Sequence, residues 1–154
     1  MSTVDIRDAD QAELLAERVR DACARETPLC IVGGNSKSRL GQAVQGEELS
    51  IKAHCGIVDY MSTELVITAR AGTPLSVVEA ALAEKGQMLP FEPPQLGENA
   101  TLGGTIACGL SGPRRPFAGA ARDLVLGVRM INGQGELVNF GGQVMKNVAG
   151  YDVS

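Results

Sequence analysis

The apolar and polar positions of the chain predict an amphipathic helix over residues 9–25. Apolar and small side chains recur there at three- and four-residue spacing, and charged side chains fill many of the remaining positions. This is the period of one face of an α-helix. Asp8 or Asp10 is placed to cap the start of the helix. The apolar stripe consists of Ala12, Leu15, Ala16, Val19, Ala22 and Cys23.

A second helix is predicted over residues 74–85. Thr73 is expected to be its N-cap, and Pro74 follows at the first helical position, where proline is well tolerated. Gly86 stands where a glycine commonly ends a helix. The apolar stripe of this helix consists of Leu75, Val78 and Leu82.

Four short runs predict β-strands, at 28–32, 65–70, 124–132 and 136–140. Short apolar runs rich in β-branched residues are typical of strands. The last two runs are joined by Asn132-Gly-Gln-Gly135, which has the chemistry of a hairpin turn. Helices and strands alternate in the first half of the chain, and a hairpin follows in the second. The pattern predicts an α+β or mixed α/β domain.

Length and charge narrow the class of protein. The 154 residues have room for one compact domain, or for one domain and a fragment of another. The 14 Lys and Arg residues against 18 Asp and Glu give a formal net charge of -4. Proteins that bind nucleic acid usually have a basic balance, because they neutralise phosphates. The acidic balance and the scarcity of aromatic side chains argue against nucleic acid as a partner.

The cysteines form no recognisable metal or redox motif. There is no Cys-x-x-Cys pair and His54 is the one imidazole, so zinc and iron–sulfur ligand sets are incomplete. Isolated thiols are typical of the reducing cytosol. The N-terminus does not resemble a secretory signal, and no apolar run has the length of a membrane span. We therefore expect a cytoplasmic protein with no metal site and no membrane span. The cysteines are Cys23, Cys30, Cys55 and Cys108.

The 19 glycines point to the first candidate site, the loop from Gly33 to Gly41 that follows a predicted strand. Backbone amides without a neighbouring Cβ can surround an anion, and the side chains of this loop add donors. The loop matches neither the P-loop pattern nor the Gly-x-Gly-x-x-Gly pattern. Taken alone, a strand followed by Gly-Gly-Asn-Ser is more often a plain turn.

The second candidate site is the passage from Ala100 to Gly112. Small residues fill nearly every position, which would let the backbone approach a flat or extended ligand closely. A tightly packed glycine-rich helix or turn without a ligand explains the composition equally well. Arg114, Arg115 and Arg122 follow, and they indicate either contact with an anion or a solvated charged surface.

Together these stretches resemble the flavin-binding domain of the vanillyl-alcohol oxidase / p-cresol methylhydroxylase (PCMH) family. The resemblance runs through residues 28–37, 69–75, 100–107, 112–123 and 146–152. The first two stretches are general features of the family. The stretch 112–123 is more specific and is similar to the FAD-binding subunits of bacterial glycolate oxidases.

The resemblance implies a PCMH-type fold of two small α/β subdomains with FAD between them. It also implies that the first loop holds the FAD pyrophosphate and that the second passage lines the isoalloxazine and ribityl groups. The first loop carries no histidine for covalent attachment, so the FAD is expected to be non-covalent. The implied FAD-binding residues are Gly33, Gly34, Asn35, Ser36 and Lys37 in the first loop, and Thr101, Gly103, Gly104, Thr105, Gly109 and Ser111 in the second passage.

The implied function is that of the FAD-binding component of a glycolate (2-hydroxy acid) oxidase or dehydrogenase complex, in which a hydride passes from substrate to flavin. The implied partners are a second flavin subunit and an iron–sulfur subunit, which would place the chain at most peripherally at the inner membrane. Residues 1–154 are expected to form one incomplete PCMH-type domain without its cap or substrate domain, because family members continue further.

Two alternatives remain open from the sequence. In the first, the chain is an assembly module that binds flavin weakly or not at all. In the second, it is another flavoenzyme of the same superfamily, such as a cell-wall precursor reductase. The sequence offers no convincing catalytic base. His54 is expected to be a structural or surface residue.

Overall fold

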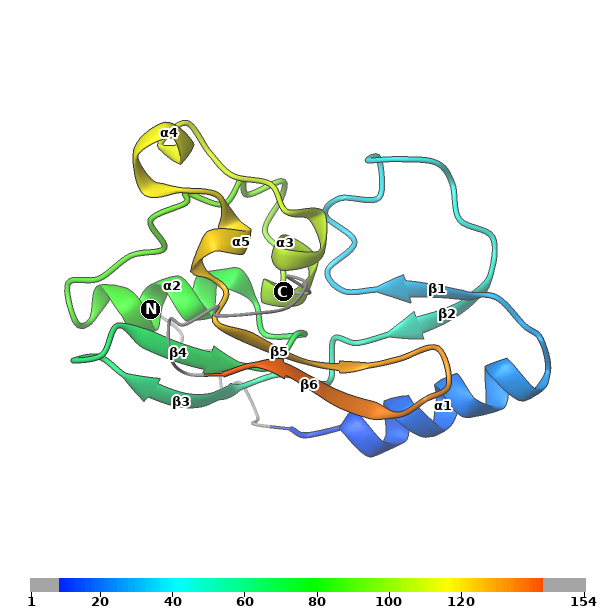
Figure 1. Cartoon of the computed structure of the whole chain (residues 1–154). Helices are drawn as coiled ribbons and strands as arrows, with labels where there is room; N and C mark the ends of the chain where they lie inside the picture. The colour runs from blue at the N-terminus through cyan, green and yellow to red at the C-terminus, as the bar shows by residue number, and fades with distance from the viewer. Residues whose placement is uncertain (1–8, 143–154) are drawn as a thin grey trace.

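The computed structural model describes residues 9–142 (Figure 1). Three two-stranded sheets are present among these residues: β1 and β2 are parallel, whereas β3–β4 and β5–β6 are antiparallel. Helices and small sheets of both kinds make this an α+β fold, as the pattern predicts. The elements are α1 (Ala12–Ala24), β1 (Leu29–Val32), β2 (Glu47–Ser50), β3 (Ile57–Met61), β4 (Val66–Ala69), α2 (Leu75–Ala83), α3 (Leu102–Cys108), α4 (Arg115–Ala118), α5 (Ala121–Leu124), β5 (Gly127–Ile131) and β6 (Leu137–Gly141).

The two predicted helices and the four predicted strands are confirmed. Their bounds are shorter than predicted, except that β6 begins and ends one residue later than the predicted strand 136–140. Strands β2 and β3, which no pattern indicated, pair with predicted strands β1 and β4. The strand predicted to begin at residue 124 begins at Gly127, because Leu124 is the last residue of α5. The start of α5 is fixed by Asp123, whose carboxylate accepts a hydrogen bond from the Ala120 amide at 2.8 Å.

The expected N-cap role of Thr73 is wrong. Pro74 occupies the N-cap position of α2, and Thr73 lies fully buried one residue earlier. Its hydroxyl accepts a hydrogen bond from the Gly56 amide at 2.9 Å and lies 3.1 Å from the Gly56 carbonyl oxygen. Its own carbonyl accepts from the Leu102 amide at 2.9 Å. Thr73 therefore joins the start of β3 to the start of α3. Gly86 does end the α2 region as predicted, with a φ of +68°.

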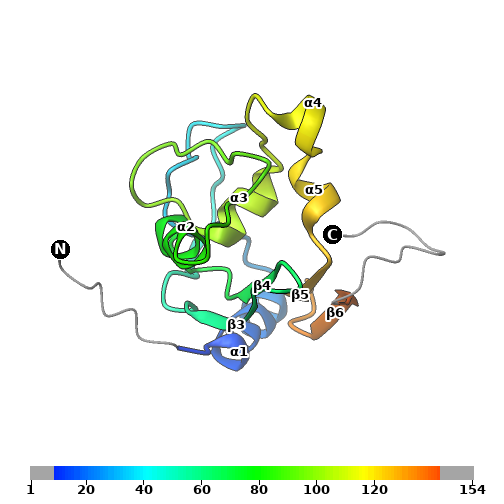
Figure 2. The same cartoon turned by 90° about the vertical axis from the view of Figure 1, so that its left-hand side faces the viewer.

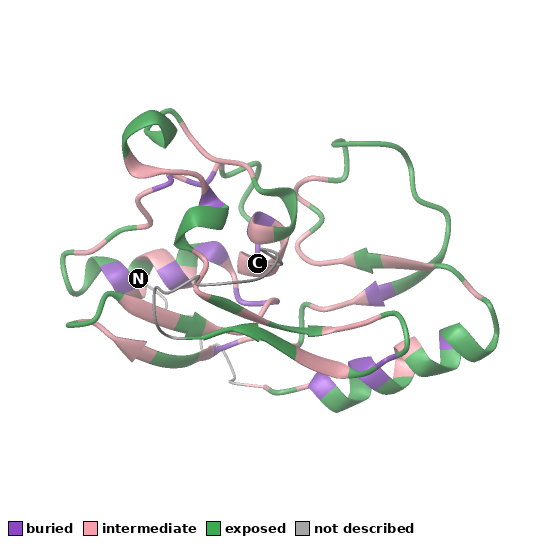
Figure 3. Ribbon diagram, viewed as in Figure 1, coloured by how far each residue is buried: buried purple, intermediate pink, exposed green. Residues whose placement is uncertain are grey.

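The core has one part around α2 and another around α1 (Figure 3). The predicted stripe of α2 is buried throughout. In the stripe of α1, Val19 is only half-buried and Cys23 is exposed, whereas Ala22 is buried. The side chain of Gln87 connects β3 to the segment after α2 by bonding to Tyr60 and to the Ser62 carbonyl. The other buried apolar residues of the two parts are Ala12, Leu15, Ala16, Ala22, Leu49, Phe91, Ala100 and Ala121.

His54 and Asp10 hold the start of α1. The Gln11 amide donates to Nδ1 of His54 at 3.1 Å, and the Ala12 amide donates to the Asp10 carboxylate at 3.0 Å. Burial lowers the pKa of His54, although the nearby Asp10 charge acts in the opposite direction. Because Nδ1 accepts a hydrogen bond, this nitrogen carries no proton. The Asp10 carboxylate, 3.6 Å from Nδ1, therefore does not form an ion pair with it. His54 is thus a structural residue, as expected. Asp8 lies outside the described residues.

The β5–β6 turn packs against α1, and both lie at the bottom of the view in Figure 2. The side-chain oxygen of Asn132 accepts hydrogen bonds from the Gln134 and Glu136 amides at 3.0 and 2.9 Å. Gly135 has a φ of +75°, and its carbonyl accepts from Arg20 at 2.8 Å. A Cβ on Gly135 would lie 2.7 Å from the Ala16 carbonyl oxygen. This position therefore requires glycine for both its φ and its contact with α1.

We predict that Gly135→Ala destabilises the protein by roughly 1–3 kcal/mol, because a side chain at this φ is strained and meets α1. Gly133→Ala, in the same turn, is the matched control: a Cβ there meets no atom within 4 Å. It should change stability by less than about 0.5 kcal/mol. Urea unfolding followed by circular dichroism measures both. Equal stability of the two variants would contradict the packing of the turn on α1.

Candidate functional site

The two glycine-rich segments singled out in the sequence are in direct contact. Gly33 and Gly34 follow β1, and the chain passes there against the segment that leads into α3. A Cβ on Gly34 would overlap the carbonyl oxygen of Asn99, and one on Gly33 would lie 2.6 Å from Oγ1 of Thr101. Only glycine allows the two backbones to come this close. The contact places the end of β1 beside the start of α3.

The first loop presents backbone donors without acceptors. Among the described residues, no amide from Gly33 to Lys37 donates a hydrogen bond to a protein group. Asn35 has a φ of +57°, in the left-handed region that Asn tolerates better than most residues. Alternation with a left-handed residue lets successive amides point to one side, which is the geometry of anion-binding backbone concavities. Asn35 supplies one left-handed residue of this kind, and the anion site itself stays a prediction.

The side chain of Lys37 strengthens this interpretation. Its Nζ is buried and has no hydrogen-bond partner among the described residues. A buried ammonium without an acceptor is costly, and a phosphate or carboxylate would remove that cost. Free amides and an unpartnered ammonium in one short loop fit an anionic ligand such as a pyrophosphate.

The second passage contributes in a different way, because the backbone amides at the start of α3 already donate to protein groups. The amides of Leu102, Gly103 and Gly104 donate to the Thr73 carbonyl, the Ala71 carbonyl and the Thr101 hydroxyl at 2.9, 2.8 and 3.2 Å. Thr101 is thus a true N-cap of α3. The small residues of the passage form a helix, one of the two structures that its composition allowed. Its contribution to a ligand lies in surface and side chains.

Within α3 the predicted residues differ in their surroundings. A Cβ on Gly103 would lie 2.7 Å from the Cβ of Ala71, so this glycine is needed for packing against the segment after β4. Thr105 is fully buried, and its hydroxyl has no hydrogen-bond partner among the described residues. Thr105 is the second unpartnered polar side chain of the region, after Lys37.

Gly109 and Ser111 lie at the other end of α3. Gly109 ends the helix in the left-handed conformation, with a φ of +58°. The Ser111 hydroxyl accepts a hydrogen bond from the Ala121 amide at 3.0 Å and so connects this end to α5. A seven-residue helix is about 10 Å long. These two residues are therefore separated by the length of α3 from the contact between the loops.

A pocket of about 560 Å³ adjoins the contact between the loops. Gly34, Asn99 and Thr101 line one part of it, and Lys52 and Glu98 add charged side chains. Sequence reasoning missed Asn99 and Lys52. Asn99 had a weak signal, since it lies two residues before a helix N-cap, whereas nothing in the sequence indicates that Lys52 comes near the loop.

The arginines after the second passage lie on α4 and α5. Arg115 and Arg122 are exposed, and Arg122 lies 3.7 Å from the carboxylate of its neighbour Asp123. The backbone amide of Arg114 donates to Glu92 at 3.1 Å. The three side chains thus belong to the solvated surface that was one of the two expectations. Over residues 9–142, no group of three or more His, Cys, Asp and Glu side chains could hold a metal ion.

Comparison with known families decides the class of this domain. Residues 6–141 match the model of the FAD binding domain family, a range that includes both glycine-rich segments. The chain belongs to the FAD binding domain family. FAD is the cofactor of that family, and the resemblance seen in the sequence is thereby confirmed. The similar stretch at residues 146–152 lies outside the described residues.

Relatives of this FAD binding domain include redox enzymes and their subunits. It is 58% identical to the glycolate oxidase subunit GlcE of Escherichia coli (strain K12), over 97% of this chain and 43% of that protein. It is 30% identical to the D-2-hydroxyglutarate dehydrogenase of Xanthomonas citri pv. viticola, over 87% of this chain and 29% of that protein. The glycolate oxidase subunit GlcD of Bacillus subtilis (strain 168) is 30% identical over 64% of this chain and 21% of that protein. The chain spans less than half the length of each of these relatives.

We predict that Gly34→Ala separates the two loops, because the new Cβ overlaps the Asn99 carbonyl oxygen. The expected result is a folded protein with a lower melting temperature that no longer retains FAD through gel filtration. Ser38→Ala, an exposed position of the same loop, is the control and should retain it. A Gly34→Ala protein with unchanged FAD content would contradict the role of this contact in the site.

Proposed function

We propose that residues 1–154 form one domain that binds FAD non-covalently, with the pyrophosphate on the first loop. The observation that carries the proposal is the set of unpaired donors there: the amides from Gly33 to Lys37 and the buried Nζ of Lys37. A pyrophosphate carries the charge and the acceptor oxygens that these groups lack. Ser36, half-buried in the same loop, adds a hydroxyl. No histidine occurs in the loop, so it offers no imidazole for covalent attachment.

The second segment is proposed to line the isoalloxazine and ribityl groups. Thr101 lies beside Gly33, and Thr105 has an unpartnered hydroxyl within the same helix. Because the first amides of α3 are used within the protein, the segment would hold the ring system mainly by shape, and Thr101, which lines the pocket, would add its hydroxyl. Gly109 and Ser111, at the far end of α3, would contact the flavin at its other side. A bound flavin supplies hydride acceptance, and the protein supplies position and electrostatics.

The activity proposed is oxidation of a small 2-hydroxy acid such as glycolate, with this domain as part of one subunit of a multi-subunit oxidoreductase. The names of the relatives support it: GlcE and GlcD are subunits of glycolate oxidases, and others are dehydrogenases of D-2-hydroxyglutarate and D-lactate. A second flavin subunit and an iron–sulfur subunit are the proposed partners. None of the helices over residues 9–142 is long and apolar enough to cross a membrane. Any membrane association is proposed to be peripheral, through the partner subunits.

Lys37→Met should weaken FAD binding by about 10- to 100-fold, the effect of losing one charge-assisted hydrogen bond. Arg39→Met is the matched control, since it removes an exposed cation from the same loop and should have little effect. Quenching of flavin fluorescence during titration measures both. Acid precipitation of the loaded wild type should release all of the flavin into the supernatant. Equal affinities of the two variants would contradict the pyrophosphate site.

The assembled complex, in its full-length form, should reduce an artificial electron acceptor dye in the presence of glycolate and not in the presence of NADPH. Glycolate-dependent reduction with flavin present in this subunit supports the proposed reaction. NADPH-dependent reduction would instead indicate a reductase of the same superfamily. Glycolate-dependent reduction by a complex whose copy of this subunit contains no flavin would indicate an assembly module.

A further inference from the structure

Glu92 connects the segment that precedes α3 to the segment that follows it. Its backbone has a φ of +46°, in the left-handed region that few residues other than glycine and asparagine adopt. A strained backbone of this kind persists only where the surrounding structure imposes it, and such residues are concentrated at functional sites. The contacts of Glu92 therefore indicate what this position does.

The contacts that hold Glu92 come from residues 112–114. Its carbonyl oxygen lies so close to Gly112 that a Cβ there would be 2.4 Å away. The Gly112 amide donates to the carbonyl of Phe91, which is buried, at 2.8 Å. The Arg114 amide donates to the Glu92 carboxylate at 3.1 Å. Glu92 thus holds the segment after α3 with both its backbone and its side chain.

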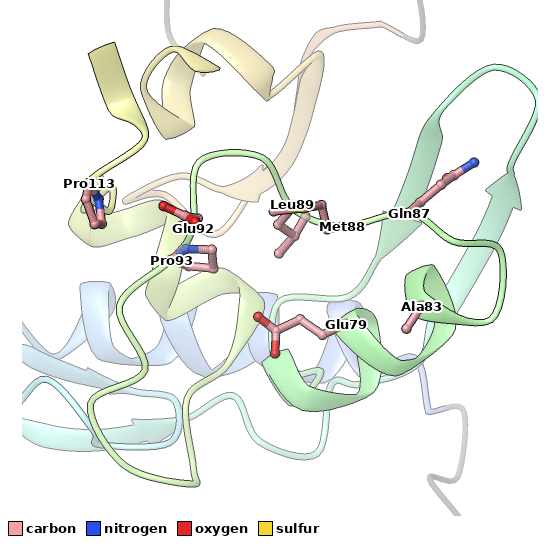
Figure 4. A pocket seen from close by; sticks show the side chains of 8 residues that line it. All are labelled: Glu79, Ala83, Gln87, Met88, Leu89, Glu92, Pro93 and Pro113. Atoms are coloured by element: carbon pink, nitrogen blue, oxygen red, sulfur yellow. The ribbon is translucent and has the colours of Figure 1, made fainter. Parts of the chain in front are cut away.

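The two segments line opposite parts of a groove of about 530 Å³ (Figure 4). Glu92 and Pro93 line it from the first segment, and Pro113 lines it from the second. In Figure 4 the Glu92 side chain is directed toward the side of the groove where Pro113 lies, as its bond to the next amide along the chain requires. The carboxylate therefore bridges the two segments.

The bridge bears on the proposed flavin site because Ser111 directly precedes Gly112. The Ser111 hydroxyl accepts a hydrogen bond from the Ala121 amide of α5 at 3.0 Å. Ser111 is therefore held by α5 through its side chain and by the Glu92 contacts through its neighbour. Gly109, which ends α3, lies two residues earlier. The far end of α3 is thus placed by groups outside the helix.

The segment that contains Glu92 reaches the first loop at its other end. There the Asn99 carbonyl oxygen meets Gly34. Between the two ends, the Gln95 amide group donates a hydrogen bond to the Glu79 carboxylate of α2. Residues 92–99 therefore join the first loop to the far end of α3, and Glu92 is the connection at that far end.

We propose that Glu92 is a positioning residue of the flavin site, and that it acts through the backbone of Gly112 and Arg114 to place Ser111 against the bound ring system. The inference rests on the proposed function, in which Ser111 contacts the flavin. Glycine would adopt φ +46° without strain, but it carries no acceptor for the Arg114 amide. Binding groups are held precisely only when such supporting hydrogen bonds are present.

The test measures FAD affinity by flavin fluorescence and the absorption bands of the bound flavin, with the protein in full-length form. Glu92→Gly relieves the strained φ and removes the acceptor. It should weaken FAD binding about tenfold, the effect of one lost hydrogen bond, and shift the flavin bands. Glu92→Gln keeps an acceptor oxygen on a side chain of the same length, so it should bind FAD within about threefold of the wild type.

Glu26→Gly is the matched control. Glu26 is the same residue type at a similar φ, +51°, and it lies exposed in the turn after α1. Its replacement should leave FAD affinity and the flavin bands unchanged. Gly112→Ala disturbs the same contact from the other side, since its Cβ meets the Glu92 carbonyl oxygen, and it should reproduce the loss. Should Glu92→Gly not fold, Gly112→Ala and Glu92→Gln decide the question.

Hydrogen exchange of the FAD-free protein measures the positioning without the cofactor. The amides of Arg114 and Ala121 donate to Glu92 and Ser111. Both should exchange faster in Glu92→Gly than in the wild type or in Glu26→Gly.

Wild-type affinity and absorption bands in Glu92→Gly would overturn the proposal, since the contact would then only pack the two segments together. Equal losses in Glu92→Gly and Glu92→Gln, or unchanged exchange in Glu92→Gly, would overturn it as well. A wild type that binds no FAD would refute the proposed function and this role together. Wild-type binding that no variant changes would refute this role alone, so the two failures are distinguished.

Discussion

The close approach of two backbones, at Gly34 and Asn99, is the constraint on which the rest of the site depends. A side chain at residue 34 would occupy the space of the Asn99 carbonyl oxygen. The same approach sets Gly33 against the N-cap residue of α3 and defines one wall of the neighbouring pocket. On the far side, Thr73 and Ala71 hold the start of α3 by accepting its amides. The start of α3 is thus fixed from two directions.

Hydrogen-bond donors divide the site into two unlike halves. The amides at the start of α3 are satisfied within the protein, so they need no ligand. The first loop has unpaired amides and a buried ammonium, which are the groups that the proposed pyrophosphate would complete. In the proposed site, the start of α3 positions the ligand and the first loop binds it.

The sequence predicted those features that depend on neighbouring residues. The stripe of α2, the Asn132 turn and the glycine loop after β1 all have local signals. Features decided by distant residues were missed. β2 is largely polar and exposed and is a strand because it pairs with β1, and Thr73 is drawn away from capping by Gly56. The buried position of Lys37 Nζ and the partnership of Gly34 with Asn99 likewise depend on tertiary structure.

The distance along the chain between the two halves of the site also has a consequence for folding. The β3–β4 and β5–β6 pairs join strands separated by short turns, and such local contacts form early at small entropic cost. The contact between Gly34 and Asn99 closes a loop that contains β2, β3, β4 and α2. Closing this loop costs more chain entropy than closing either hairpin, so we expect the elements inside it to form first. During synthesis the first loop leaves the ribosome well before its partner, and the proposed anion site is complete only when both are present.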